Sequence, residues 1–288
     1  MKERIISGAV IAVMIVGFGL LGGYPLSILI MVCSMIGYQE LVKAAGVLDK
    51  DDKYNAISAV GLVMTIVLYA GFMVLTARLG GDSRQLVLTS DFWAMMIVVL
   101  TFLLMMAVYV LTFPKFRSEQ VMAGFFSFVY APLLMSYVAR SRVLPYGIFM
   151  YALIFICSSV CDTCALAAGM MFGKHKMAPV LSPKKTVEGA VGGVAGSAVC
   201  SFILGYVVKY VDPGADFRIQ FLIIGICGAL VSMIGDLAAS AIKRNHEIKD
   251  YGNLIPGHGG IMDRFDSIIF TAPLIYILGV FLLGTVAL

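Results

Sequence analysis

Long apolar segments separated by short polar loops follow one another along almost the whole chain. Each segment is close to the roughly 20 residues that an α-helix needs to cross about 30 Å of hydrocarbon. The pattern predicts nine membrane-spanning helices, over residues 4–21, 24–45, 55–78, 92–112, 119–139, 146–172, 187–208, 217–243 and 265–286. We therefore expect an all-α polytopic membrane protein in which residues 1–288 form a single integral-membrane domain.

The composition agrees with this expectation and narrows the classes of partner. Of the 288 residues, 60% are hydrophobic and 13% are charged, whereas soluble proteins are about half apolar and about a quarter charged. The formal net charge is only +4, and no solvated basic domain is present that could follow a phosphate backbone. A lipid bilayer is therefore an expected partner, and nucleic acid is not.

The basic residues predict an orientation in the membrane. With nine spans, the N-terminus shares one side with the loops after spans 2, 4, 6 and 8, and this side holds most of the 21 lysines and arginines. Because loops rich in Lys and Arg stay in the cytoplasm, we expect a cytoplasmic N-terminus and an external C-terminus. Residues 1–23 resemble a signal peptide, but no A-x-A cleavage site follows, so a retained first helix is expected.

Acidic residues inside or against the apolar segments are the first candidates for function. Glu40, Asp162, Glu188 and Asp236 lie there, and a charged carboxylate costs at least about 2.5 kcal/mol at the centre of a membrane helix. Glu40 precedes Lys43 by three residues, and we interpret these two as an interfacial ion pair.

One helix face near the end of span 8 carries three polar residues. Asp236, Ser240 and Lys243 recur at positions i, i+4 and i+7, so they lie on the same side of a helix. The structural alternative is that Asp236 pairs with Lys243 or Arg244 and braces two helices.

The loop from Ser240 to Asp266 is rich in charges and glycines, unlike the rest of the chain. Asp263 and Asp266 would lie near the start of span 9, where the helix dipole also favours carboxylates. If Asp236 and Asp263 meet where spans 8 and 9 reach the cytoplasm, they could bind Mg²⁺, alone or with a second cation. His258 in the PGHGG turn could contact phosphate or brace the turn.

The loop between spans 6 and 7 holds a second polar cluster. Ser182 and Pro183 fit the N-cap and first position of a helix. Lys184 and Lys185 would then stand on its first turn, where free N–H groups favour anions. This arrangement, followed by Glu188, predicts a clamp for a triphosphate. An ordinary basic cytoplasmic loop is the alternative.

Common catalytic motifs are absent from the chain. The sequence contains no Walker A motif, no G-x-S-x-G elbow and no H-E-x-x-H zinc pair. Instead, Asp162, Asp236 and Asp263 are expected at one depth, close to the cytoplasmic lysines and arginines. Acids for metal ions beside bases for phosphates favour phosphoryl or nucleotidyl transfer.

Three motifs together resemble one enzyme family. The segments SAIKR, KDYG and IPGHGGIMDRFD between Ser240 and Asp266, with SPKKTVEG at Ser182–Gly189 and the pair Gly235–Asp236, are similar to phosphatidate cytidylyltransferases, also called CDP-diacylglycerol synthases. The resemblance implies that CTP and phosphatidic acid give CDP-diacylglycerol and pyrophosphate, with Mg²⁺, at the cytoplasmic face of the cell inner or plasma membrane. It also suggests a homodimer.

The resemblance assigns expected roles to individual residues. The expected catalytic residues are Asp236, Asp263, Lys243 and Asp250, of which Asp236 and Asp263 are the metal ligands. The expected substrate-binding residues that the resemblance implies are the basic ones: Lys184, Lys185, Lys243, Arg244, Lys249 and Arg264. The placement of the residues along the chain adds His258, Asp162, Ser182 and Glu188 to the expected substrate-binding residues. The chain departs from the family at Asp162–Ala167, where it reads DTCALA in place of a run like DTGAYF, so recognition of the base should differ in detail.

Two other classes of function fit the sequence less well. A secondary transporter also has intramembrane acids and interrupted helices, but it predicts acids near the midplane and internal repeats, and the sequence indicates neither. A CDP-alcohol phosphotransferase would need a D-G-x-x-A-R array, which the chain lacks.

Overall fold

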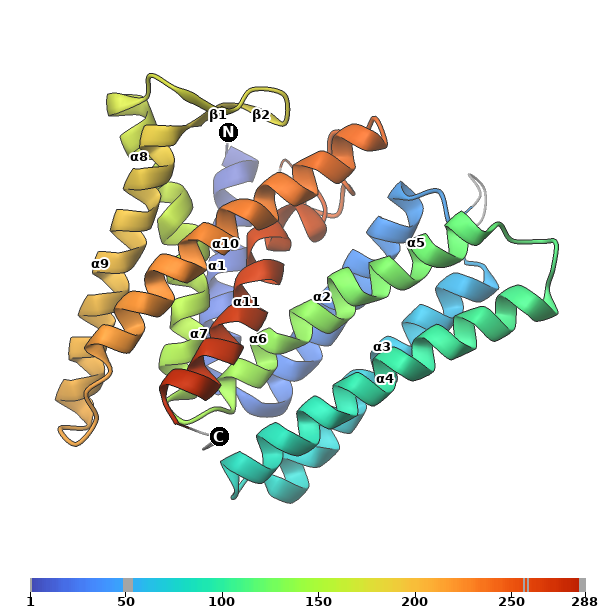
Figure 1. Ribbon diagram of the computed structural model, residues 1–288, viewed down its shortest axis with the longest axis horizontal. Coiled ribbons are helices and arrows are strands. Elements are labelled where there is room, and N and C mark those ends of the chain that lie inside the picture. The colour runs from blue at the N-terminus through green and yellow to red at the C-terminus, as the bar shows by residue number, and fades with distance from the viewer. Residues whose placement is uncertain (1, 49–53, 256, 258, 285–288) are drawn as a thin grey trace. The chain divides into compact units, whose positions relative to one another are not determined.

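Long helices make up most of the computed structural model, which describes residues 2–48, 54–255, 257 and 259–284 (Figure 1). In these residues, eight helices are long and apolar enough to cross a membrane: Gly23–Ala44, Ala56–Leu79, Ser83–Leu111, Ser118–Arg142, Gly147–Phe172, Val187–Val211, Arg218–Asn245 and Met262–Leu282. A shorter apolar helix, Val10–Leu21, forms part of α1 (Lys2–Leu21). These helices coincide with the nine predicted spans, which confirms an all-α polytopic membrane protein.

The chain divides into two compact units, Met1–Ala139 with His246–Arg264, and Arg140–Asn245 with Phe265–Leu288. The first unit contains α1, α2 (Gly23–Ala44), α3 (Ala56–Leu79), α4 (Ser83–Leu111), α5 (Ser118–Phe128), the π-helical turn η1 (Val129–Leu133) and most of α6 (Leu134–Arg142). The second unit contains α7 (Gly147–Phe155), the π-helical turn η2 (Ile156–Val160), α8 (Cys161–Phe172), β1 (Lys176–Ala178), β2 (Ser182–Thr186), α9 (Val187–Val211), α10 (Arg218–Asn245) and most of α11 (Met262–Leu282).

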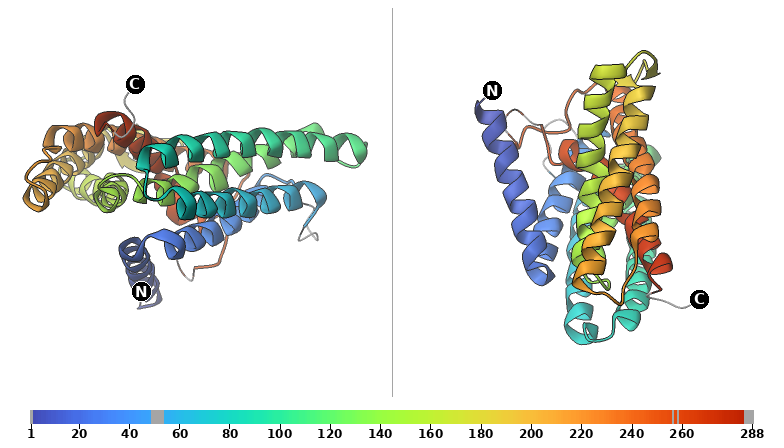
Figure 2. Two further views of the ribbon diagram at one scale, coloured as in Figure 1. Left: turned by 90° about the horizontal axis from the view of Figure 1, so that it is seen from below. Right: turned by 90° about the vertical axis from the view of Figure 1, so that its left-hand side faces the viewer.

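In the first unit, α2 and α3 approach each other closely because a glycine leaves room for a tyrosine. A Cβ atom built at Gly61 of α3 would clash with the hydroxyl of Tyr38, which is fully buried. The helices α3 and α4 run side by side, whereas α1 meets α2 at the turn between them and projects away from α3 and α4 (Figure 2). Much of α4 exposes large apolar side chains such as Phe92, Met95 and Leu103, as expected for a helix in contact with lipid.

In the second unit, α8 packs against α9 through small residues. A Cβ atom at Gly192 would lie 2.3 Å from the Cβ of Ala168, and one at Gly196 would lie 2.4 Å from the Sγ of Cys164. Small residues let membrane helices approach at backbone distance. Figure 2 shows α8, α9 and α10 side by side in its right-hand view.

A short antiparallel hairpin of β1 and β2 connects α8 to α9, and it corrects one prediction. Ser182 pairs with Ala178 in this hairpin and is not the N-cap of a helix. Instead, Thr186 caps α9, because its hydroxyl accepts a hydrogen bond from the N–H of Gly189 at 3.1 Å. Lys184 and Lys185 therefore stand on a strand that precedes the helix.

Candidate active site

A pocket of about 410 Å³ opens in the second unit between α8, the hairpin, α9 and α10. Its polar lining combines two carboxylates, two ammonium groups and a hydroxyl, from Asp162, Asp236, Lys184, Lys185 and Thr186. Its apolar lining includes Leu166, Met170, Met177 and Met233. Charged and apolar surfaces thus face the same space.

An ion pair joins the hairpin to α10 at this pocket. The ammonium of Lys185 donates a hydrogen bond to Oδ2 of Asp236, and both side chains are about a quarter exposed. The sequence suggested Lys243 or Arg244 of the same helix as partners for Asp236, whereas this partner comes from another element. The pair fixes the end of β2 over α10, so that an acid and a base share one wall of the pocket.

Asp162 lines the pocket from the first turn of α8. The π-helical turn η2 precedes it, and such turns frequently mark functional sites because they change the face that the following residues present. The carboxylate lies close enough to Asp236 and Lys185 to interact with both electrostatically. The structure therefore brings together four of the predicted site residues, Asp162, Lys184, Lys185 and Asp236.

Asp266 is an acid of the second unit that was not among the predicted site residues. It interacts electrostatically with Asp236, Lys243 and Asp162, and its Oδ1 accepts a hydrogen bond from the N–H of Ser267 at 2.7 Å. The signals for it in the sequence were its place near the start of span 9, where the helix dipole favours carboxylates, and its place at the end of the IPGHGGIMDRFD motif. In the part of the chain that the structure describes, no three His, Cys, Asp or Glu side chains are close enough together to hold a metal ion unaided.

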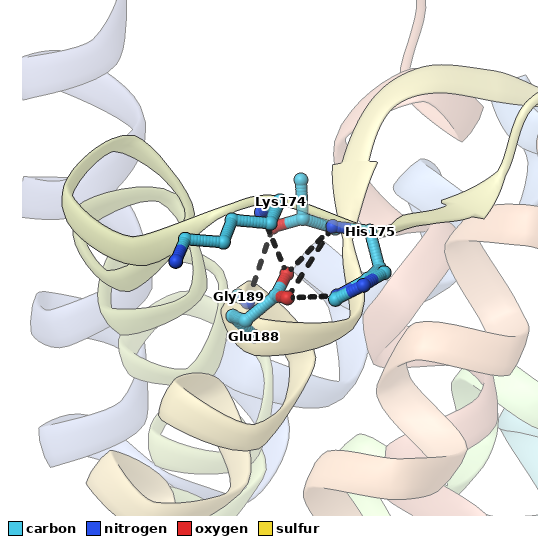
Figure 3. A network of polar contacts seen from close by, with 5 residues as sticks. Lys174, His175, Glu188 and Gly189 are labelled. Atoms are coloured by element: carbon cyan, nitrogen blue, oxygen red, sulfur yellow. Dashed lines mark hydrogen bonds and ion pairs between the residues drawn. The ribbon is translucent and has the colours of Figure 1, made fainter.

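Glu188, at the start of α9, holds the base of the hairpin. Its Oε2 accepts a hydrogen bond from the N–H of Lys174 at 3.0 Å, and its Oε1 lies 2.6 Å from Nδ1 of His175 (Figure 3). The N–H of His175 also points to both carboxylate oxygens, at 3.3 and 3.2 Å. The contacts of Glu188 are thus with the hairpin, and neither Glu188 nor Ser182 lines the pocket. Substrate binding by these two residues stays a prediction.

In the first unit, Asp263 closes the loop that precedes α11. Its Oδ2 accepts hydrogen bonds from the N–H groups of Tyr251 at 2.8 Å and Gly260 at 3.0 Å, and the side chain is buried. Gly259 between these donors has a φ of +87°, a conformation that glycine adopts without strain. The loop is therefore folded around the carboxylate.

Glu40 has different partners from those we predicted. Its carboxylate accepts hydrogen bonds from the N–H groups of Ile261 and Met262, at 3.0 and 2.8 Å. The predicted ion pair with Lys43 is wrong, because the free N–H groups at the start of α11 offer a buried carboxylate two partners.

The remaining predicted residues are divided between the units. Lys243 and Arg244 end α10 in the second unit, whereas Lys249, Asp250, Asp263 and Arg264 belong to the first unit. Lys249, Asp250 and Arg264 are exposed. His258 lies outside the described residues. The convergence of Asp236, in the second unit, with Asp263, in the first, stays a prediction.

Known proteins similar to this chain agree on one family. A family model described as "Cytidylyltransferase family" matches residues 2–282. The chain belongs to this family. The phosphatidate cytidylyltransferase of Bacillus subtilis (strain 168) is 31% identical over 284 residues, which cover 96% of this chain and 97% of that protein. The phosphatidate cytidylyltransferase of Staphylococcus aureus (strain COL) is 30% identical over 283 residues, with 96% and 98% coverage.

A third relative, the phosphatidate cytidylyltransferase of Staphylococcus saprophyticus, is 41% identical over 145 residues, which cover 49% of this chain and 52% of that protein. These matches confirm the family resemblance that the sequence motifs indicated.

The departure from the family pattern lies at the pocket itself. Leu166, where the sequence resemblance led us to expect an aromatic residue, lines the pocket and is 63% exposed. Cys164, where the resemblance led us to expect a glycine, packs its sulfur against Gly196 of α9. An aliphatic side chain thus forms the wall of this pocket at that point.

Proposed function

We propose that the protein makes CDP-diacylglycerol and pyrophosphate from CTP and phosphatidic acid. A phosphate oxygen of phosphatidate attacks the α-phosphorus of CTP, and the bond from that phosphorus to the oxygen bridging to the β-phosphate breaks, which releases pyrophosphate. The observation that carries this proposal is the pocket in which Lys184, Lys185, Asp162 and Asp236 face the same space as exposed apolar side chains. The relatives named phosphatidate cytidylyltransferase support the choice of substrates.

The chemistry demands alignment and charge neutralisation more than proton removal. A phosphate monoester is largely dianionic near pH 7, because its second pKa is about 6. Its attack on CTP brings two anions together, and positively charged groups offset their repulsion. Lys184 and Lys185 supply such groups at the pocket, and the paired Asp236 keeps the Lys185 ammonium in place.

The apolar lining suits the lipid substrate. Leu166 and Met170 are 63% and 74% exposed and lie on α8 beside the pocket. Because α8 ends a membrane-spanning segment, these side chains offer the glycerol and acyl part of phosphatidate an apolar surface next to the lysines. CTP, which is polar throughout, is expected to enter from water.

Mg²⁺ is the cofactor that we propose, alone or with a second cation. Mg²⁺ is commonly held by one or two carboxylates together with substrate phosphates and water, so the carboxylates of this chain fit it without a cluster of three. Asp236 would hold it, with Asp263 as the second ligand that the family resemblance implies. When bound, the ion would neutralise the charge of the phosphates.

The basic loops support a cytoplasmic location for this pocket in a cell inner or plasma membrane. Lys184 and Lys185 lie in the loop between spans 6 and 7, one of the loops that the excess of Lys and Arg assigns to the cytoplasm. CTP would then be taken from the cytoplasm. A homodimer is compatible with the small-residue helix faces, and we propose it only as the family expectation.

The test uses purified protein in phosphatidate-containing vesicles with CTP and Mg²⁺. We expect pyrophosphate and CDP-diacylglycerol only when phosphatidate is present, and we expect Asp236→Asn to lower the rate at least about 100-fold, as losses of transition-state electrostatics do. Asp82→Asn is the matched control, because Asp82 caps α4 and asparagine caps a helix equally well. Pyrophosphate release without phosphatidate, or full activity of Asp236→Asn, would refute the proposal.

A further inference from the structure

Glu40 is a buried carboxylate near the end of α2, more than two hundred residues away in sequence from the groups that it binds. Ile261 donates its N–H to Oε1 at 3.0 Å, and Met262 donates its N–H to Oε2 at 2.8 Å. The residue is only 9% exposed. A buried carboxylate that binds two backbone N–H groups makes charge-assisted hydrogen bonds, which are stronger than neutral ones.

Two glycines of the loop let this carboxylate in. A Cβ atom at Gly252 would lie 2.4 Å from Oε1 of Glu40, and one at Gly260 would lie 2.3 Å from the same oxygen. The carboxylate cannot move aside without breaking its bonds to Ile261 and Met262. The loop therefore closes around Glu40 at both ends, and each end has glycine where a side chain would collide.

Asp263 completes the same arrangement from the other side. It binds the N–H groups of Tyr251 and Gly260, so the two carboxylates hold neighbouring amides at the end of the loop and Asp263 also ties its beginning. Between these points, Ile255 and Gly259 form an isolated antiparallel bridge. Lys249 and Asp250, just before the closed segment, are thereby held in a fixed relation to Arg264, just after it.

We propose that Glu40 is a positioning residue for the reaction, which fixes the segment His246–Arg264, made of the loop and the first residues of α11, in the shape that presents Lys249, Asp250 and Arg264. The effect that we expect on kinetics rests on the proposed function, whereas the hydrogen bonds by which Glu40 fixes the loop do not. Glu40 itself touches backbone groups, so it acts through the loop and not on the substrate. If the carboxylate only stabilised the fold, its loss would lower the melting temperature, and kcat would not fall at an unchanged melting temperature.

The first test compares Glu40→Gln with the wild-type protein and with Glu119→Gln, an exposed glutamate at the start of α5 that serves as matched control. The amide oxygen of glutamine can accept a hydrogen bond from one of the two backbone N–H groups, but its NH₂ group would face the other N–H group. We expect kcat to fall about 10- to 100-fold, as small misplacements of catalytic groups do, with the melting temperature close to that of the control. Amide hydrogen exchange at residues 251–262 should accelerate, while exchange in α9 and α10 stays unchanged.

Each other outcome counts against the proposal. Wild-type kinetics in Glu40→Gln would show that the loop does not need this carboxylate, whatever the exchange rates. Unchanged exchange at residues 251–262 would show that Glu40 does not hold the loop. A loss of activity that comes with general unfolding would make the role structural. If the wild-type protein formed no CDP-diacylglycerol, the proposed function would fail, and the exchange measurement would still decide whether Glu40 holds the loop.

A second test uses the crowding at Gly252. The added methyl group in Gly252→Ala should push Glu40 from its partners, so this variant should resemble Glu40→Gln in kinetics and exchange. In the Glu40→Ala background, the same methyl group has space. We therefore expect Gly252→Ala to add less than about a twofold loss there, since residues in contact are non-additive. Full additivity of the two losses would overturn the proposal.

Discussion

Asp236 and Lys185 show what one side-chain contact contributes to the pocket. Each side chain is charged, partly exposed and next to apolar surface, where an unpaired charge would be costly. Their ion pair lets a strand residue and a membrane-helix residue stand side by side, with opposite charges facing the space that a phosphate substrate would fill. Neither residue would be equally well placed without the other.

Lys185→Met removes the charge and keeps the length of the side chain. We expect kcat/KM for CTP to fall about 100-fold, because one preorganised charge at the transferring phosphate is lost, and because Asp236 loses its partner. Steady-state kinetics in vesicles would measure this loss. Lys176→Met, which changes an exposed lysine of β1 in the same hairpin, is the matched control. A loss of equal size in both variants would mean that the hairpin needs general positive charge and not Lys185.

The hairpin between α8 and α9 is the element that brings the lysines to the pocket, and hydrogen bonds at its base hold it in place. Glu188 binds the N–H groups of Lys174 and His175 and the ring of His175, and the N–H of Val187 returns to the carbonyl of His175 at 2.9 Å. A hairpin of two short strands is marginally stable by itself. The contacts at its base therefore determine where β2 lies.

Glu188→Gln is expected to loosen this hairpin. The amide group cannot accept all the N–H groups that the carboxylate accepts, so hydrogen exchange at residues 174–186 should accelerate and KM for CTP should rise about 10-fold, the loss expected when a charge-assisted hydrogen bond worth about 1.5 kcal/mol is removed. Exchange mass spectrometry and kinetics would be read on the same preparation. Reduced activity with unchanged exchange would instead favour direct substrate binding by Glu188, as its position beside the two lysines suggested in the sequence.

At the scale of the whole molecule, the order of the nine membrane spans predicts which loops lie on the cytoplasmic side of the membrane. We expect Lys174, between α8 and α9, on the cytoplasmic side and Arg84, at the start of α4, on the outside. Single cysteines introduced at these exposed positions in a cysteine-free protein would be labelled with a membrane-impermeant reagent in inside-out and right-side-out vesicles. Labelling of both positions from the same side would contradict the nine-span order.

The sequence predicted the spans well because membrane helices depend on local composition, which is visible without tertiary structure. It also singled out Asp162, Lys184, Lys185 and Asp236, which line one pocket in the structure, since charge beside apolar segments is rare. It could not find the Lys185–Asp236 pair or the role of Glu40, because both contacts join residues far apart in the chain. The predicted cap at Ser182 failed because Thr186, four residues later, satisfies the same rule and the strand pairing decides between them.

The fit of Glu40 between Gly252 and Gly260 has a consequence for how the chain can change over evolutionary time. While the glutamate is present, a side chain at either glycine position would collide with its carboxylate. If the glutamate is lost, both positions have room for a side chain. The three positions should therefore be inherited together. In an alignment of the cytidylyltransferase family, we expect sequences that lack an acid at position 40 to be those that accept larger residues at 252 and 260. The residues at positions 40, 252 and 260 would then covary, although position 40 is far from the other two in the chain.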